Sequence, residues 1–128
     1  MKKLVFLLLA VMMLTACGQD KENAQGAVYV NITAEEAKQI MDSAEGYIIL
    51  DVRTQEEYDE GHIPGAMVIP HEEIAERAED TLTDKDQLIL VYCRSGRRSK
   101  IAAEALAELG YTNIKEFGGI IDWPYEVE

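Results

Sequence analysis

The chain has 128 residues, of which 48% are hydrophobic, and its 24 acidic and 12 basic side chains give a formal net charge of −12. This length fits one small domain with a single core. The excess of acidic residues argues against nucleic acid or an anionic membrane surface as a partner held by charge. One stretch departs from this balance, because Arg94, Arg97 and Arg98 lie close together in the chain.

The N-terminus predicts an export signal. Two lysines follow Met1, and a largely apolar run occupies residues 4–16. This run is shorter than the roughly 20 residues that a membrane-spanning helix needs, and it has the character of the apolar core of a secretory signal. We therefore expect residues 1–16 to be removed as a signal peptide.

The end of this run, Leu14-Thr15-Ala16-Cys17, resembles a bacterial lipobox. The resemblance implies that Cys17 receives lipid, such as palmitate, and becomes the first residue of the mature protein. Two or more acyl chains anchor a protein stably to a membrane. We expect residues 17–27 to be a polar tether and the protein to be anchored outside the cytoplasm, in the periplasm or on the outer face of the cell membrane. The alternative is an ordinary cleaved signal with a chance cysteine.

Strand-like and helix-like segments alternate from residue 28 onward, which indicates an α/β fold. We expect one domain at 28–128, with a mostly parallel, five-stranded central sheet covered by helices on both faces in three layers. The predicted elements, in chain order, are a strand at 28–32, a helix opened by a capping box at 33–36, a strand at 47–52, a short helix or turn at 54–61, a strand at 66–70, a short helix at 71–80, a strand at 87–92, a helix at 99–109 and a strand at 113–117.

Two of these strands have continuous apolar runs, at 47–50 and 88–91, as strands buried on both faces do. Ligands of parallel sheets bind beyond the carboxyl ends of the strands. Residues 51–53 and 93–98 follow these two runs, so the candidate site lies at this edge of the sheet.

Cys93 is the only cysteine besides Cys17, which excludes a disulfide within the domain if Cys17 is lipidated. A helix N-terminus and neighbouring guanidinium groups favour a reactive thiolate. Gly96 permits a left-handed backbone turn, in which successive N–H groups can face an anion. The alternative is an inert, buried cysteine that acts as a small hydrophobic residue.

Four segments resemble the motifs of rhodanese-like domains, the sulfurtransferase family, and the likeness extends over about residues 28–125. The segments are LDVR at 50–53, EEYDEGHIPGAMVIP at 56–70, VYCRSGRRS at 91–99 and FGGIIDW at 117–123. The resemblance implies a rhodanese-like fold and a sulfurtransferase activity. A small anionic sulfur donor, thiosulfate or a persulfide, would pass its outer sulfur to Cys93, and a nucleophilic acceptor, which could be a protein, would remove it.

The same resemblance assigns roles around Cys93, the catalytic nucleophile. Arg94 and Arg98 are our candidates for anion binding and thiolate stabilisation, and Arg97 for steering anions from the surface. The complete predicted anion-binding loop is Arg94, Ser95, Gly96, Arg97, Arg98 and Ser99.

Four further residues are predicted to support the structure around the loop: Asp51, Arg53, Glu57 and His62. We expect Asp51 to accept hydrogen bonds, Arg53 and Glu57 to pair with each other, and His62 to hold a turn. The two histidines and Cys93 have no metal-ligand spacing, so we expect neither a metal nor another cofactor.

Two alternative functions remain. Phosphatases related to this family place five residues between the cysteine and the arginine of the loop, whereas four separate Cys93 from Arg98. This spacing favours a loop that fits sulfur. The other alternative is a module that carries a persulfide, or docks a partner, without turnover.

Overall fold

The structure, a computed structural model, describes residues 28–128, so the predicted signal peptide, Cys17 and the tether lie outside the described residues. Its centre is a five-stranded sheet in the order β1-β5-β4-β2-β3. All neighbouring strands pair in parallel. The strands are β1 (Val30–Asn31), β2 (Ile48–Asp51), β3 (Met67–Val68), β4 (Ile89–Cys93) and β5 (Ile114–Gly119).

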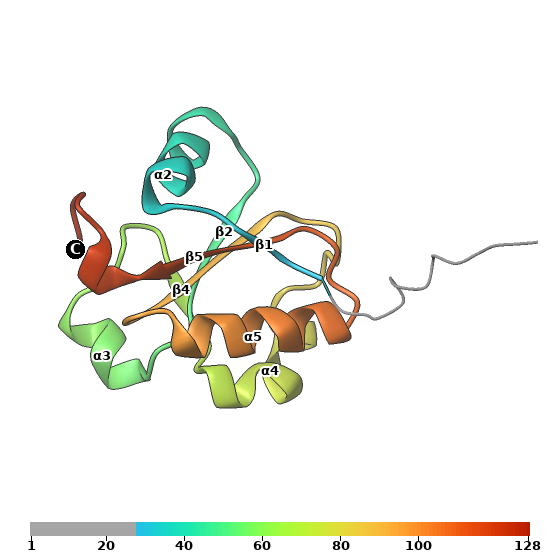
Figure 1. The fold of residues 1–128 in the computed structure, drawn as a ribbon. Helices are drawn as coiled ribbons and strands as arrows, with labels where there is room; N and C mark the ends of the chain where they lie inside the picture. Colours follow the sequence, from blue (N-terminus) through green and yellow to red (C-terminus); the bar gives the residue numbers. More distant parts are fainter. Residues whose placement is uncertain (1–27) are drawn as a thin grey trace, which may run out of the picture.

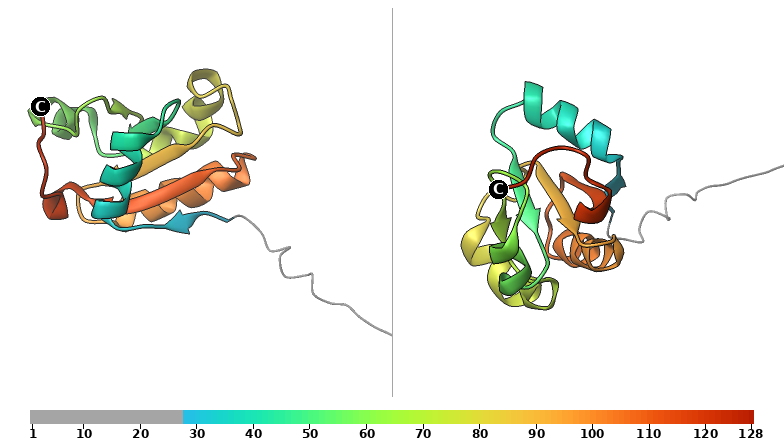
Figure 2. Two further views of the ribbon diagram at one scale, coloured as in Figure 1. Left: turned by 90° about the horizontal axis from the view of Figure 1, so that it is seen from above. Right: turned by 90° about the vertical axis from the view of Figure 1, so that its left-hand side faces the viewer.

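Helices cover both faces of the sheet, as the alternation predicted. Figures 1 and 2 show α2 (Ala34–Ser43) on one face, and α4 (Ile74–Thr81) and α5 (Arg97–Glu108) side by side on the other. A short helix, α3 (Gln55–Glu60), and two single 3₁₀ turns, η1 (His71–Glu73) and η2 (Ile120–Asp122), complete the described elements. The three-layer α/β prediction is therefore confirmed.

The apolar core is divided by the sheet into two parts. On the face of α4 and α5, buried side chains of β2 and β4, among them Leu50 and Val91, pack against Leu106 and Ala102. On the face of α2, Leu90 belongs to a second cluster of buried side chains, several of which are aromatic. All five residues of β4 are buried, as expected for the central strand of a parallel sheet.

Two local sequence signals determine where helices begin. Thr33 and Glu36 form the predicted capping box at the start of α2, each satisfying a backbone N–H of the other. Thr54 and Glu57 form a second capping box, so the segment predicted as a short helix or turn is the helix α3. Capping matters for α3 because a helix this short has little stability of its own.

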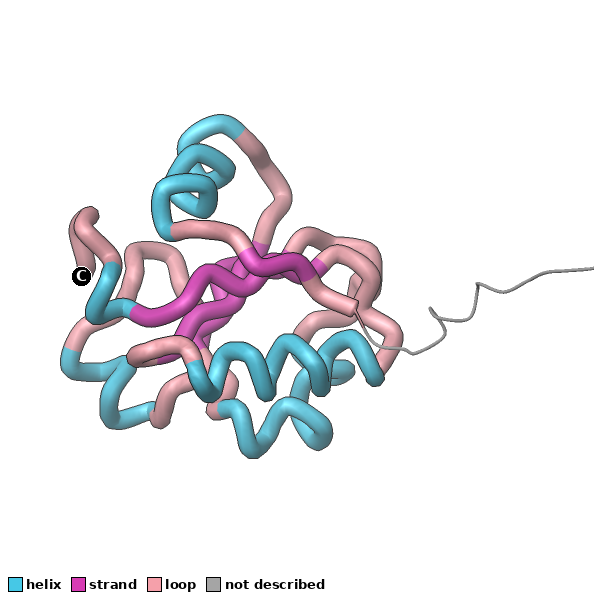
Figure 3. Tube along the Cα trace, in the orientation of Figure 1, coloured by secondary structure: helices cyan, strands magenta, loops and turns pink. Residues whose placement is uncertain are grey.

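The carboxyl ends of β2, β4 and β5 meet at one edge of the sheet, on the left of Figure 1 and Figure 3. The chain leaves this edge into α3, α5 and η2, respectively. Hence the loop between β4 and α5 lies at the edge predicted to carry the site.

Within residues 28–128, no helix combines the length and the apolar character that crossing a bilayer requires.

Candidate functional site at the carboxyl end of β4

Cys93 is the last residue of β4, and its sulfur lies at the base of the following loop. The Gly96 N–H donates a hydrogen bond to Cys93 Sγ at 3.0 Å. The cysteine is only 1% exposed, and it is a free thiol. A main-chain N–H aimed at the sulfur stabilises negative charge on it without the cost of reorienting water.

The loop is held in a tight turn between β4 and α5. Gly96 caps α5 with a left-handed backbone, at φ 114°, which glycine adopts without steric strain. Gly119 of β5 approaches the loop so closely that a Cβ there would lie 2.0 Å from the carbonyl oxygen of Arg94. The same carbonyl accepts a hydrogen bond from Ile121 N–H at 3.2 Å. Thus β5 and η2 fix the loop that surrounds the sulfur.

The three arginines of the loop occupy different environments. Arg94 and Arg97 are exposed, whereas Arg98 is partly buried. Arg98 forms a two-pronged ion pair with Glu57 of α3, at 2.8 and 3.1 Å. This hydrogen-bonded pairing with Arg98 lowers the pKa of Glu57 from 4.5 to about 2.

The predicted pairing of Arg53 with Glu57 is wrong. Arg53 lies before the capping residue of α3, and its guanidinium turns toward Asp51, with Nη2 2.6 Å from Oδ2. The buried Asp51 carboxylate also accepts the Arg53 N–H at 2.9 Å. Because Asp51 engages Arg53 locally, Glu57 is left to bind Arg98 across the site.

Asp51 connects β4 to the turn after α3. Its Oδ2 accepts a hydrogen bond from Tyr92 O–H at 2.6 Å, and that hydroxyl accepts one from Ile63 N–H at 3.1 Å. Burial, followed by the bond to Asp51, raises the pKa of Tyr92 well above its ordinary value. Arg53 Nη2 additionally donates to the carbonyl of Gly61 at 2.7 Å. This network holds Tyr92, the residue that precedes Cys93 in β4.

His62 belongs to the turn rather than to the cysteine loop. Its ring stacks on Tyr58 with centroids 3.8 Å apart, and its Nδ1 lies 3.0 Å from the Tyr58 carbonyl oxygen. Its Nε2 lies 3.5 Å from a carboxylate oxygen of Glu128. These contacts give His62 a place in the packing of the turn.

Ser99 was predicted to bind anions with the rest of the loop, but it is fully buried. The Cys93 thiol donates to Ser99 Oγ at 3.4 Å, and Ser99 donates in turn to Glu116 Oε2 at 2.5 Å. The sequence motifs do not include Glu116. The available signal was an acid two residues from an inward-facing apolar side chain, Ile114, in a predicted strand.

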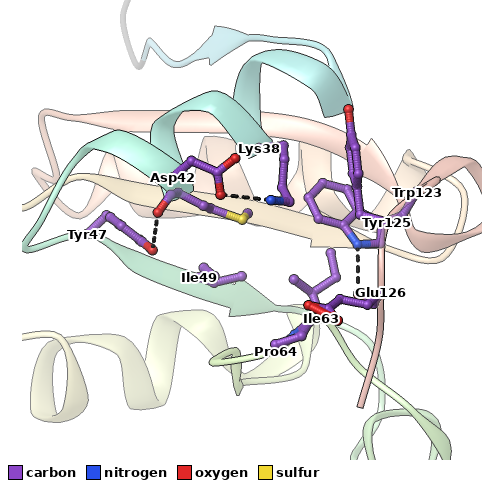
Figure 4. A pocket seen from close by; sticks show the side chains of 10 residues that line it. Lys38, Asp42, Tyr47, Ile49, Ile63, Pro64, Trp123, Tyr125 and Glu126 are labelled. Carbon is purple, nitrogen blue, oxygen red and sulfur yellow. Dashed lines mark hydrogen bonds and ion pairs between the residues drawn. The ribbon is translucent and has the colours of Figure 1, made fainter.

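A separate hollow of about 200 Å³ lies on the α2 face of the sheet (Figure 4). Its lining combines apolar, aromatic and charged side chains and includes no residue of the loop 93–99. The lining residues of the hollow are Lys38, Met41, Asp42, Tyr47, Ile49, Ile63, Pro64, Trp123, Tyr125 and Glu126.

Within the described part of the chain, no three His, Cys, Asp or Glu side chains are grouped so that they could hold a metal ion.

Comparison with known families identifies the domain. The sequence profile described as "Rhodanese-like domain" matches residues 33–124. A relative from Escherichia coli named "Thiosulfate sulfurtransferase PspE" is 42% identical over 73 residues, which are 57% of this chain and 70% of the relative. A relative from Bacillus subtilis named "Putative sulfur carrier protein YrkF" is 37% identical over 112 residues, 87% of this chain but only 60% of that protein.

Solved structures agree with these relatives. A structure described as "rhodanese with anions from E. coli" superimposes with a TM-score of 0.60 and 38% identity, covering 64% of this chain and 96% of that one. A rhodanese-related protein from Thermoplasma volcanium gives a TM-score of 0.67 with 31% identity, covering 78% of this chain and 98% of that one. Sequence and fold thus point to the same family.

Proposed function

This chain belongs to the rhodanese-like domain family, and we propose that it is a sulfurtransferase in which Cys93 carries the transferred sulfur as a persulfide. The observation that carries the proposal is the hydrogen bond from Gly96 N–H to the Cys93 sulfur at the N-terminus of α5. A sulfur nucleophile needs this kind of fixed, partly positive surrounding.

The proposed reaction has two steps. Cys93 thiolate attacks the outer sulfur of thiosulfate, a new S–S bond forms, and the S–S bond of the donor breaks as sulfite leaves with the electron pair. An acceptor such as cyanide then attacks the outer sulfur of the persulfide, leaves as thiocyanate and returns the thiolate. Splitting one transfer into two displacements is the usual advantage of covalent catalysis.

The positively charged loop supports an anionic donor. Arg94 and Arg97 are exposed on a protein whose formal net charge is −12, so they offer an approaching anion a local attraction. Arg98 is engaged by Glu57, and its guanidinium still interacts electrostatically with Cys93. We therefore assign steering to the exposed pair and support of the sulfur to Arg98.

The test is direct transfer of sulfur to the full-length protein, purified in mild detergent. Incubation with thiosulfate should add one sulfur atom to Cys93, detected by intact and peptide mass spectrometry, and cyanide should then remove it as thiocyanate. The Cys93→Ser variant is the control and should remain unmodified. Absence of the adduct, together with release of phosphate from an aryl phosphate, would replace the proposal with a phosphatase.

A persulfide carrier is the second candidate. Two observations favour it: Cys93 is 1% exposed, and one relative is named as a putative sulfur carrier. A carrier would form the persulfide and hold it in the presence of cyanide, then release it to a partner protein. The rate of thiocyanate formation, compared with the rate of adduct formation in the same preparation, separates the two candidates.

We also propose that Cys17 is lipidated and that residues 17–27 tether the domain to the outside of a bacterial cell membrane. The proposal rests on the lipobox-like residues 14–17 after an apolar run. Metabolic labelling with a palmitate analogue should mark the full-length protein and should not mark the Cys17→Ala variant. An unlabelled wild-type protein found in the soluble fraction would contradict the anchor.

A further inference from the structure

We propose that Ser99 and Glu116 form a proton relay that accepts the proton of the Cys93 thiol before the sulfur attacks. Ser99 touches the reacting sulfur, and Glu116 acts through Ser99 as a positioning residue. The inference deepens the proposed function and rests on it, because it assigns the origin of the thiolate that sulfur transfer requires. It concerns a buried carboxylate to which the family motifs above assign no role.

The geometry forms a continuous chain of donors and acceptors. Cys93 S–H points to Ser99 Oγ at 3.4 Å, within reach for a sulfur donor, and Ser99 O–H points to Glu116 Oε2 at 2.5 Å. A hydroxyl is both a donor and an acceptor, so Ser99 can receive one proton while it releases another. Ser99 and Glu116 are both fully buried, which separates this path from bulk water.

Glu116 makes two further hydrogen bonds inside the fold. Its Oε2 also accepts the Gly118 N–H at 2.9 Å, and its Oε1 accepts a side-chain hydrogen bond from Asn31. Together with Ser99, these donors satisfy the hydrogen bonds of a side chain that would otherwise be costly to bury. Within residues 28–128 none of the ion pairs involves Glu116, so the hydrogen bonds alone balance its burial.

If Cys93 and Glu116 were both ionised, these two buried negative charges, separated only by Ser99, would repel each other strongly. The relay avoids this cost because the thiol proton moves to Ser99 Oγ while the Ser99 proton moves to Glu116. The charge is then transferred from Glu116 to Cys93, and no second charge is created. Atoms and charges balance: the S–H and O–H bonds break, two O–H bonds form, and the sulfur keeps its electron pair for attack.

Charged or titratable groups reach the surroundings of this pair from α5 and from the segment before β1. Lys100 of α5 has its Nζ 3.6 Å from where a Cβ on Gly96 would lie, so its ammonium is close to the loop. From α5, the Arg98 guanidinium interacts electrostatically with Cys93. From the segment before β1, Tyr29 interacts with Glu116 and with Glu104 of α5. Burial, followed by these two carboxylates, raises the pKa of Tyr29 above its ordinary value. Arg94 and Arg97 of the same loop are exposed.

The decisive variant is Glu116→Gln in the full-length protein. Glutamine has nearly the same shape, and Asn31 can rotate its amide to present an oxygen to the new NH₂ group, so the fold is retained. The rates of Cys93 alkylation by iodoacetamide and of single-turnover persulfide formation from thiosulfate are measured from pH 5 to pH 10. The control Glu104→Gln removes an exposed carboxylate of α5 without touching the relay.

We expect Glu116→Gln to slow both rates by about 10-fold or more below pH 7, as loss of a general base does, and to approach the wild-type rates by pH 10, where hydroxide removes the proton. Ser99→Ala should show the same profile, and Ser99→Thr should restore most of the neutral-pH rate. These Ser99 variants keep the test decisive if Glu116→Gln fails to fold.

Three results would overturn the relay. Rates for Glu116→Gln that equal or exceed the wild-type rates at neutral pH would mean that the carboxylate only repels the thiolate. A loss of equal size at every pH would indicate a structural role, and a loss matched by Glu104→Gln would indicate a general charge effect. Failure of the proposed function would look different. The wild-type protein would then form no persulfide from thiosulfate, while the pH dependence of its alkylation by iodoacetamide would still differ from that of the relay variants.

Discussion

The ion pair between Glu57 and Arg98 makes a stability contribution that depends on pH, and Glu57→Gln isolates it. Glutamine at this position can still close the capping box with Thr54, because its side-chain oxygen accepts the Thr54 N–H as Glu57 does at 3.0 Å. The substitution therefore removes the charge that binds Arg98 and leaves the start of α3 intact. The resulting change in the free energy of unfolding therefore measures the ion pair and not the helix cap.

The magnitude follows from the pKa shift. The pKa of Glu57 falls from 4.5 to about 2. At 1.36 kcal/mol per pKa unit this corresponds to roughly 3 kcal/mol as an upper limit. The side chains of Arg98 and Glu57 are 19% and 27% exposed, and solvent screening reduces the free energy of unfolding that the pair contributes to about 1–2 kcal/mol.

The sign of the pH dependence is determined by the lowered pKa. The contribution is fully present above pH 4.5, where Glu57 is ionised in both states, and it is lost as pH falls toward 2. We expect Glu57→Gln to lower the free energy of unfolding by about 1–2 kcal/mol at pH 7, and this difference to shrink to about 20–40% of its value by pH 3.5.

Urea denaturation followed by Trp123 fluorescence at pH 7 and pH 3.5 measures this difference. The matched control is Glu73→Gln, which removes the exposed pair with Arg77 and should cost no more than about 0.5 kcal/mol at either pH. A Glu57→Gln protein as stable as wild type at pH 7, or a difference that stays constant as pH falls, would refute the reasoning.

Three further predictions concern the cysteine loop and the residues around it. Tyr92→Phe removes the hydroxyl that binds the buried Asp51 and should lower the free energy of unfolding by about 1–3 kcal/mol, measured by urea denaturation. Gly119→Ala places a methyl group inside the loop backbone and should abolish persulfide formation, whereas Gly118→Ala meets no atom within 4 Å and should cost only the strain of its left-handed backbone, so equal losses would contradict the packing. Arg97→Ala should slow the bimolecular reaction with thiosulfate at low salt by about 2- to 10-fold and leave the rate at 1 M salt unchanged; the same slowing at both salt concentrations would exclude steering.

Several features of this protein could be predicted from local sequence because the physics that produces them is local. The alternation of apolar strands and amphipathic helices predicted a three-layer sheet with helices on both faces, and the structure has this architecture. The capping box at Thr33 indicated the start of α2. The buried run before Cys93 placed the loop at the carboxyl edge, because parallel strands end together.

The side-chain partners at the site depend on contacts between distant segments. Glu57 and Arg53 are neighbours in the chain, so a local pair was expected, yet Glu57 binds a residue 41 positions away. The capping turn at Thr54 separates the two side chains, and Asp51 lies closer to Arg53. Which carboxylate meets which guanidinium is decided by how α3 packs beside the start of α5.

Glu116 illustrates the same limit more sharply. In the sequence it is one acidic residue among many near the end of a strand, and only its two-residue spacing from Ile114 indicates that it faces inward. The parallel pairing of β5 with β4, at Val91 and Cys93, brings Glu116 beneath the first turn of α5 and next to Ser99. The sequence by itself determined the layers of the fold and the position of the cysteine loop, since hydrophobic period and turn chemistry act over a few residues. Only the tertiary structure decided which charges are paired and which carboxylate lies buried behind the sulfur, because those contacts join strands and helices far apart in the chain.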